Sequence, residues 1–178
     1  MKMLKKLLAV VLTGAMALTL LTACGGNAVT EKSIADAMTD MAKAQGVKAT
    51  FTPRAKEREL AREIAALLEG KATDEDSNDA IKKILDYDQG GANAGNFVWW
   101  GKAPVDKIGT SGQAFSFWYY TSAQDNAEND SNLTNKTPAD DRNMGTALCK
   151  MSDDDGNLVT WRVIVVTAKA EDPDPEKT

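Results

Sequence analysis

The chain has 178 residues, with 21 basic side chains, 26 acidic side chains and no histidine, and its formal net charge at pH 7 is −5. An acidic chain without a basic patch is a poor candidate for nucleic-acid binding. The absence of histidine excludes Ser–His and Cys–His nucleophile pairs, a histidine general base and the usual histidine-containing zinc sites. We expect no catalytic residue, no metal ion and no cofactor.

The first residues have the pattern of an export signal. Lys2, Lys5 and Lys6 form a positive segment, and residues 7–21 form an apolar stretch. That stretch is short for a membrane span, which needs about 20 apolar residues. No second apolar run follows it, so the pattern predicts a secretory signal that is removed.

The junction Leu21-Thr22-Ala23-Cys24-Gly25-Gly26 resembles the lipobox of bacterial lipoproteins. The resemblance implies that residues 1–23 are removed and that Cys24 receives diacylglyceryl and palmitate-type acyl chains. It also implies a protein anchored to the extracytoplasmic face of the cell membrane. The alternative is an ordinary signal peptide with a chance cysteine. Two acyl chains anchor a protein stably, since each buried CH₂ contributes ~0.8 kcal/mol.

The remainder divides into three segments. Residues 24–29 form a lipidated spacer, residues 30–169 suit a single globular domain, and residues 170–178 form an acidic, proline-containing tail that we expect to be disordered. Removing residues 1–23 takes away three lysines and no acid, so the net charge falls from −5 to −8. Cys149 then has no cysteine partner, and it is either a buried small apolar residue or a free thiol.

The first half of the domain is predicted to be helical. Apolar residues at helical spacing indicate a first helix that begins at Thr30 or Ser33 and ends before Gly46. Residues 47–52 form a connector or a short strand. Thr52-Pro53 predicts the start of a second helix, with threonine as the cap. A third helix is predicted over residues 79–87.

Aromatic residues dominate the middle of the chain. Residues 89–96 form a loop, residues 97–100 a short strand or buried turn, and residues 115–120 the densest aromatic run. Core packing is one interpretation of these rings, because both faces of any element here would be aromatic. The other is a surface for a ligand or partner, formed by Trp99, Trp100, Trp118, Tyr119 and Tyr120. Residues 122–141 are expected to form a long polar stretch.

A β-hairpin is predicted at the end of the domain. Residues 143–151 and 158–166 read as strands, and residues 153–157 form the turn between them. The second strand is apolar on both faces, which is typical of a central strand. Asp153, Asp155 and Asn157 are spaced like the start of a calcium loop, but Ile164 stands where its closing glutamate would be.

Several segments resemble the CAP (SCP-like) domain. The resemblance rests on residues 42–53 and 60–65, on Phe117-Trp118-Tyr119-Tyr120-Thr121-Ser122, and on residues 143–147, 155–157 and 161–163. It implies an α+β domain of layered helix/sheet/helix type, with N-terminal helices followed by a C-terminal hairpin. The family's cleft carries two histidines with acidic partners. This chain contains no histidine, so we expect that site to be lost.

We expect a non-catalytic, CAP-like surface module that binds a cell-envelope ligand or a surface-protein partner. One alternative is a cell-envelope hydrolase that uses carboxylates alone, with candidates Asp86, Asp88, Asp125 and Glu128. A second alternative is a small ligand-binding lipoprotein for a transporter. Its usual two-lobed fold needs a longer chain.

Overall fold

The computed structural model describes residues 29–105, 108–122 and 133–173, and one compact unit begins at Glu31. The predicted signal, Cys24 and most of the spacer lie outside the described residues. So do Asp125, Glu128 and the last five residues of the predicted tail. Within the described residues, no helix is both long and apolar enough to cross a membrane.

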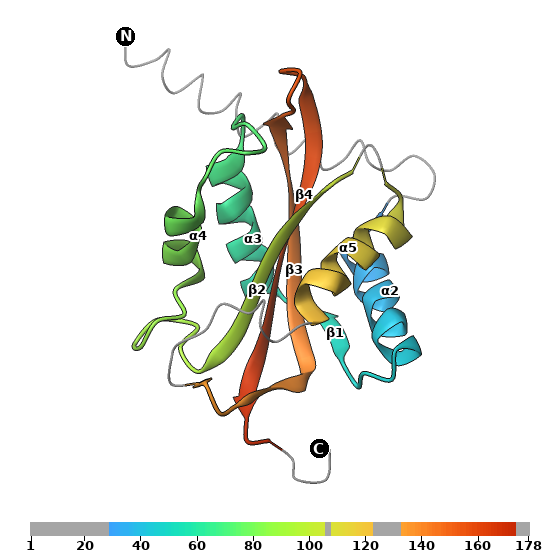
Figure 1. Ribbon diagram of the computed structural model, residues 1–178, viewed down its shortest axis with the longest axis vertical. Coiled ribbons are helices and arrows are strands. Elements are labelled where there is room, and N and C mark those ends of the chain that lie inside the picture. The colour runs from blue at the N-terminus through green and yellow to red at the C-terminus, as the bar shows by residue number, and fades with distance from the viewer. Residues whose placement is uncertain (1–28, 106–107, 123–132, 174–178) are drawn as a thin grey trace. The chain divides into compact units, whose positions relative to one another are not determined.

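The centre of this unit is a mixed sheet of four strands. They are β1 (Thr50–Pro53), β2 (Asn96–Pro104), β3 (Thr137–Ser152) and β4 (Leu158–Glu171), in the spatial order β1-β3-β4-β2. β1 runs parallel to β3, whereas β4 is antiparallel to both β3 and β2. The predicted C-terminal hairpin is therefore confirmed, and its second strand is central (Figure 1).

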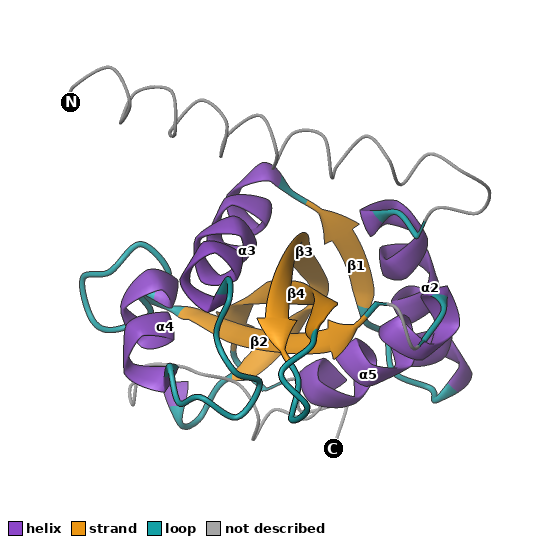
Figure 2. Ribbon diagram, turned by 90° about the horizontal axis from the view of Figure 1, so that it is seen from above, coloured by secondary structure: helices purple, strands orange, loops and turns teal. Residues whose placement is uncertain are grey.

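Four helices are described, and they cover the two faces of the sheet. α3 (Ala55–Leu68) and α4 (Asn78–Leu85) lie on one face, and α2 (Glu31–Ala44) and α5 (Thr110–Ser122) lie on the other (Figure 2). The unit is thus an α+β domain with a helix layer on each side of the sheet. The predicted order of elements is wrong in one respect, because β1 and β2 alternate with the helices instead of following them.

An apolar core fills the space between the sheet and α3. It contains Ile64, Leu68 and Met151, together with the central-strand residues Val163 and Val165, all almost completely buried. Side chains of a strand alternate between the two faces of its sheet, so odd-numbered residues of β4 point toward α3. Trp161 extends this row and packs, half-buried, against the same core.

Three predicted boundaries need correction. The second helix does not begin at Thr52-Pro53, because Pro53 is the last paired residue of β1; Arg54 precedes the helix and makes no side-chain cap. A proline fits an edge strand since it has no N–H to leave unpaired. β2 is longer than residues 97–100, and β3 begins at Thr137 instead of residue 143, inside the predicted polar stretch of residues 122–141.

Candidate binding surface

α5 forms the outer surface of the domain beside β2. Its inward residues Gln113, Ala114, Phe117 and Thr121 are buried and follow helical spacing. Three aromatic residues point outward instead: Phe115 is 56% exposed, Tyr119 62% and Tyr120 49%. We call these three residues the aromatic face. The interpretation of the whole run 115–120 as core is wrong, because an α-helix can bury only one side against the sheet.

The five aromatic residues predicted to form a surface do not lie together. Trp99 is only 1% exposed and stacks on Phe97 with ring centroids 6.1 Å apart, so it belongs to the core and not to a surface. Trp100, the next residue of β2, points to the opposite face of the sheet and packs against the α3 core. Trp118 is half-buried, while Tyr119 and Tyr120 are exposed.

The aromatic face rests directly on β2 at one point. A Cβ atom placed on Gly101 would meet the ring of Tyr120 at 3.7 Å, which is ordinary contact, so Tyr120 lies over this glycine. The rings of Tyr119 and Tyr120 meet edge to face, with centroids 6.0 Å apart and an interplanar angle of 79°. Edge-to-face packing is a favoured arrangement for aromatic pairs, so the two tyrosines support each other.

A buried arginine holds the C-terminal end of α5. Arg142 on β3 donates a hydrogen bond from Nη1 to the carbonyl oxygen of Thr121, in the last turn of the helix. Its guanidinium lies 5.0 Å from the ring centroid of Trp99 and 5.8 Å from that of Phe51. Burial lowers the pKa of Arg142, and Asp140 partly offsets this shift. A cation at a helix C-terminus is favourable because the last carbonyls carry partial negative charge.

A second buried arginine holds the N-terminal half of α5. Arg162 on β4 donates from Nε to Gln113 Oε1 at 2.9 Å and from Nη1 to Thr146 Oγ1 at 3.2 Å. Gln113 in turn donates to the carbonyl oxygen of Ile108 at 3.0 Å. Burial lowers the pKa of Arg162, with Glu31 acting in the opposite direction. The two arginines thus fix α5 to the sheet at both ends.

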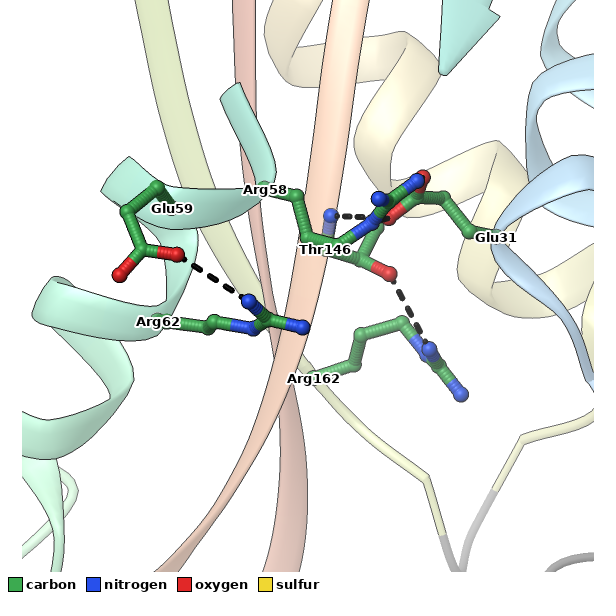
Figure 3. A network of polar contacts seen from close by, with 6 residues as sticks. All are labelled: Glu31, Arg58, Glu59, Arg62, Thr146 and Arg162. Atoms are coloured by element: carbon green, nitrogen blue, oxygen red, sulfur yellow. Dashed lines mark hydrogen bonds and ion pairs between the residues drawn. The ribbon is translucent and has the colours of Figure 1, made fainter. Parts of the chain in front are cut away.

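The network continues from Thr146 to both helix layers (Figure 3). The backbone N–H of Thr146 donates to Glu31 Oε2 at 2.9 Å. Thr146 lies beyond the last residue of β3 that pairs with β1, so the carboxylate supplies the acceptor that a neighbouring strand would otherwise provide. Arg58 on α3 binds the same carboxylate, with its Nη2 atom 2.6 Å from Glu31 Oε1. This hydrogen-bonded pairing raises the pKa of Arg58. Glu31 therefore links α2, β3 and α3.

Two surface depressions are lined by residues outside α5. One, of about 420 Å³, is open and is lined by Asp79, Lys82, Lys83, Asp86 and Asp88. Two of the carboxylates considered for hydrolysis lie here, but Asp86 caps α4 in the left-handed region and its Oδ2 accepts the N–H of Ala92 at 2.7 Å. That carboxylate stabilises the following loop.

The second depression, of about 220 Å³, lies beside Lys102 and Trp100. The Lys102 amino group donates to the carbonyl oxygen of Thr73 at 2.8 Å and lies 5.7 Å from the ring centroid of Trp161. Burial lowers the pKa of Lys102, while Cys149 and Asp74 raise it. The amino group is thus used to hold the 71–77 loop against β2.

Two further sequence candidates have structural roles. Cys149 is buried, which agrees with its interpretation as a small apolar residue. Burial raises the pKa of its thiol to about 11. Glu69 adds to this shift, and Lys102 opposes it. Asp153 Oδ1 accepts the backbone N–H groups of Asp155 at 3.1 Å and Asn157 at 2.8 Å, an arrangement that shapes the hairpin turn. No cluster of three or more potential metal ligands occurs among the described residues.

Some residues of the candidate surface and of its supporting network were not predicted from the sequence. Phe115 was not included in the predicted surface, although its spacing of four residues from Tyr119 places both on one side of a helix. Arg142 and Arg162 received no role. A signal for Arg162 was present, since a charged residue between Trp161 and Val163 in an apolar strand needs buried partners.

Comparisons with known proteins do not assign a family or a function to this chain. No protein-family model, no curated protein and no solved structure matches this chain.

Proposed function

We propose that the protein is an extracytoplasmic lipoprotein, anchored through Cys24, whose domain acts as a non-catalytic binding module. The observation that carries this proposal is the aromatic face of α5. Soluble proteins seldom expose several neighbouring large rings unless these contact another molecule. Tyrosine and phenylalanine also provide a large contact area at low cost in side-chain entropy.

The CAP-like character of the domain is part of the same proposal. It is supported by a first helix that ends at Ala44 before Gly46, a short strand, a second helix at residues 55–68 and a closing hairpin. These elements contain most of the segments on which the sequence resemblance rests; the remaining one, residues 117–122, forms the end of α5. With no histidine in the chain, the cleft chemistry of that family has no counterpart here, and this supports binding over catalysis.

The anchoring part of the proposal can be tested separately. In cells that express the full-length chain, Cys24→Ser should release the protein from the membrane fraction or block its maturation, because the sulfur that accepts the lipid is lost. Cys149→Ser is the matched control, since that thiol is buried in the domain. Unchanged membrane retention and normal processing of Cys24→Ser would refute the anchor.

The binding part is tested by cosedimentation with cell-envelope particles of purified residues 25–178, which lack the signal and the lipid anchor but contain the whole compact unit from Glu31 onward. The double substitution Phe115→Ser with Tyr119→Ser should abolish sedimentation while leaving the melting temperature nearly unchanged, since both side chains are exposed. Leu158→Ser is the matched control, because Leu158 is 64% exposed in a different region, the start of β4. Equal sedimentation of all three proteins would exclude the aromatic face as the binding surface.

A further inference from the structure

The chemistry of α5 restricts what the aromatic face can bind. Charged residues make up 26% of the chain, yet the thirteen residues of α5, Thr110–Ser122, include none. A partner recognised through charge would gain little from such a surface, and the excess of acidic residues elsewhere disfavours polyanions. The composition of α5 therefore points to an uncharged ligand.

Hydroxyl groups accompany the rings. Ser111, Phe115 and Tyr119 are spaced four residues apart and are all exposed, so they form one stripe along the helix. Ser116 and Tyr120 form a second stripe beside it. A surface made only for an apolar partner helix would carry aliphatic side chains between its rings. Alternating flat rings and hydroxyls suit a ligand with both apolar faces and hydroxyl groups.

The shape of the surface gives a second restriction. Small molecules are usually enclosed in concave sites, whereas Phe115 is 56% and Tyr119 62% exposed, so neither ring lies inside an enclosed site. An exposed helix side instead suits an extended chain that lies across it. The hydrogen bonds from Arg142 to Thr121 and from Arg162 to Gln113 hold the helix in place beforehand, which reduces the ordering cost of binding.

We propose that the aromatic face binds an uncharged polysaccharide of the cell envelope, with pyranose rings stacked on Phe115 and Tyr119. Pyranose rings have an apolar face of C–H groups, which packs on an aromatic ring, and hydroxyl groups at their edges, which bond to polar neighbours. This inference rests on the proposed binding function and names the class of its ligand.

The test uses purified residues 25–178, the same lipid-free chain as in the envelope test, and two uncharged probes, N-acetylchitotetraose and cellotetraose, in calorimetric titrations. At least one probe should bind. Phe115→Leu and Tyr119→Leu keep apolar area but lose the flat ring, and each should weaken binding about tenfold, as expected for loss of one stacked ring. Tyr119→Phe keeps the ring and loses only the hydroxyl, so it should weaken binding less than Tyr119→Leu does. Leu158→Ser should bind like the parent.

Three results would overturn the inference in distinguishable ways. If neither sugar binds but the chain still sediments with envelope particles through Phe115 and Tyr119, the ligand class is wrong and the binding module stands. If the sugars bind equally well to the leucine variants, stacking on the aromatic face is wrong. If the parent chain binds neither the sugars nor the envelope particles, the proposed function is refuted as well.

Discussion

The sheet face under α3 and α4 and the face under α2 and α5 bury side chains of different chemistry. The first is mainly an aliphatic core with Cys149, Met151 and Tyr87. It also buries a hydrogen bond from Thr167 to Glu57, but no arginine among the described residues. The second combines Phe51, Trp99 and Phe117 with two buried arginines and the polar residues that bind them. Aliphatic packing stabilises a fold without fixing one arrangement closely, whereas hydrogen-bonded arginines work only in one geometry. The difference suits a domain that uses one helix layer for stability and the other to present a surface.

The largest expected effect on stability is the difference between substitutions on the buried and exposed sides of α5. Phe117 is completely buried and Phe115 is 56% exposed, although both are phenylalanines two residues apart. Phe117→Ala should lower the free energy of unfolding by about 3–5 kcal/mol, whereas Phe115→Ala should change it by no more than about 0.5 kcal/mol. Urea unfolding followed by circular dichroism measures both. Equal destabilisation would mean that α5 does not present Phe115 outward.

The second prediction compares the two faces at glycine positions. A Cβ atom on Gly145 would lie 2.0 Å from the backbone nitrogen of Arg58 and 2.4 Å from its Cα atom, because α3 begins directly over this glycine. Gly101, on the α5 side, has only ordinary contacts at 3.7 Å and beyond.

Gly145→Ala should therefore cost about 1–3 kcal/mol or more through displacement of α3, while Gly101→Ala should cost less than about 1 kcal/mol. Thermal unfolding of the two variants provides the comparison. A Gly145→Ala protein that melts like the parent would show that α3 does not approach β3 this closely.

The two faces also differ in how far they could be predicted from sequence. The hairpin, the central position of its second strand and the Trp161-Val163-Val165 row followed from runs of β-branched residues, because period-two burial is a local pattern. The covering of β2 by α5 did not follow. It depends on pairing between Trp99 and Val166, which are far apart in the chain, and on arginines whose acceptors lie on other elements.

The aromatic run shows the same limit on a smaller scale. Ring content alone favoured burial of residues 115–120, but helical geometry divides them into an inner residue, Phe117, and outer residues, Phe115, Tyr119 and Tyr120. Which rings are exposed depends on whether the run forms a helix or a strand. A run of six aromatic and hydroxyl residues has no clear hydrophobic periodicity, so its sequence does not decide between the two. Of the five residues predicted for a surface, only Tyr119 and Tyr120 belong to the aromatic face, and Phe115 was missed.

The third prediction concerns the arginine network. Arg162→Met keeps most of the side-chain volume but leaves Gln113 Oε1 and Thr146 Oγ1 without their donor. Unsatisfied buried polar groups cost about 1–3 kcal/mol, and the free energy of unfolding should fall by that amount. Arg62→Met, which removes an exposed arginine paired with Glu59 at 3.1 Å, should cost no more than about 0.5 kcal/mol.

Sugar affinity sharpens this comparison, since Arg162→Met should also weaken binding of whichever probe the parent binds, whereas Arg62→Met should not. A stable Arg162→Met protein with parental affinity would show that Arg162 does not position α5.

The smallest expected effect lies on the apolar face, at Cys149. Burial raises its thiol pKa from an ordinary value near 9 to about 11, so the folded protein keeps its proton at pH values where the unfolded chain has lost it. The stability linked to this thiol is complete below the unfolded pKa and is lost as pH rises through the folded pKa, because the unfolded chain then binds fewer protons. Relative to Cys149→Ala, the parent should lose about 1 kcal/mol of unfolding free energy between about pH 8 and about pH 10. Groups that do not interact with Cys149 cancel in this comparison, so the difference reports the thiol and its coupling to Lys102. A constant difference across this range would mean that water reaches Cys149, and that the core under α3 is less closed than its aliphatic packing indicates.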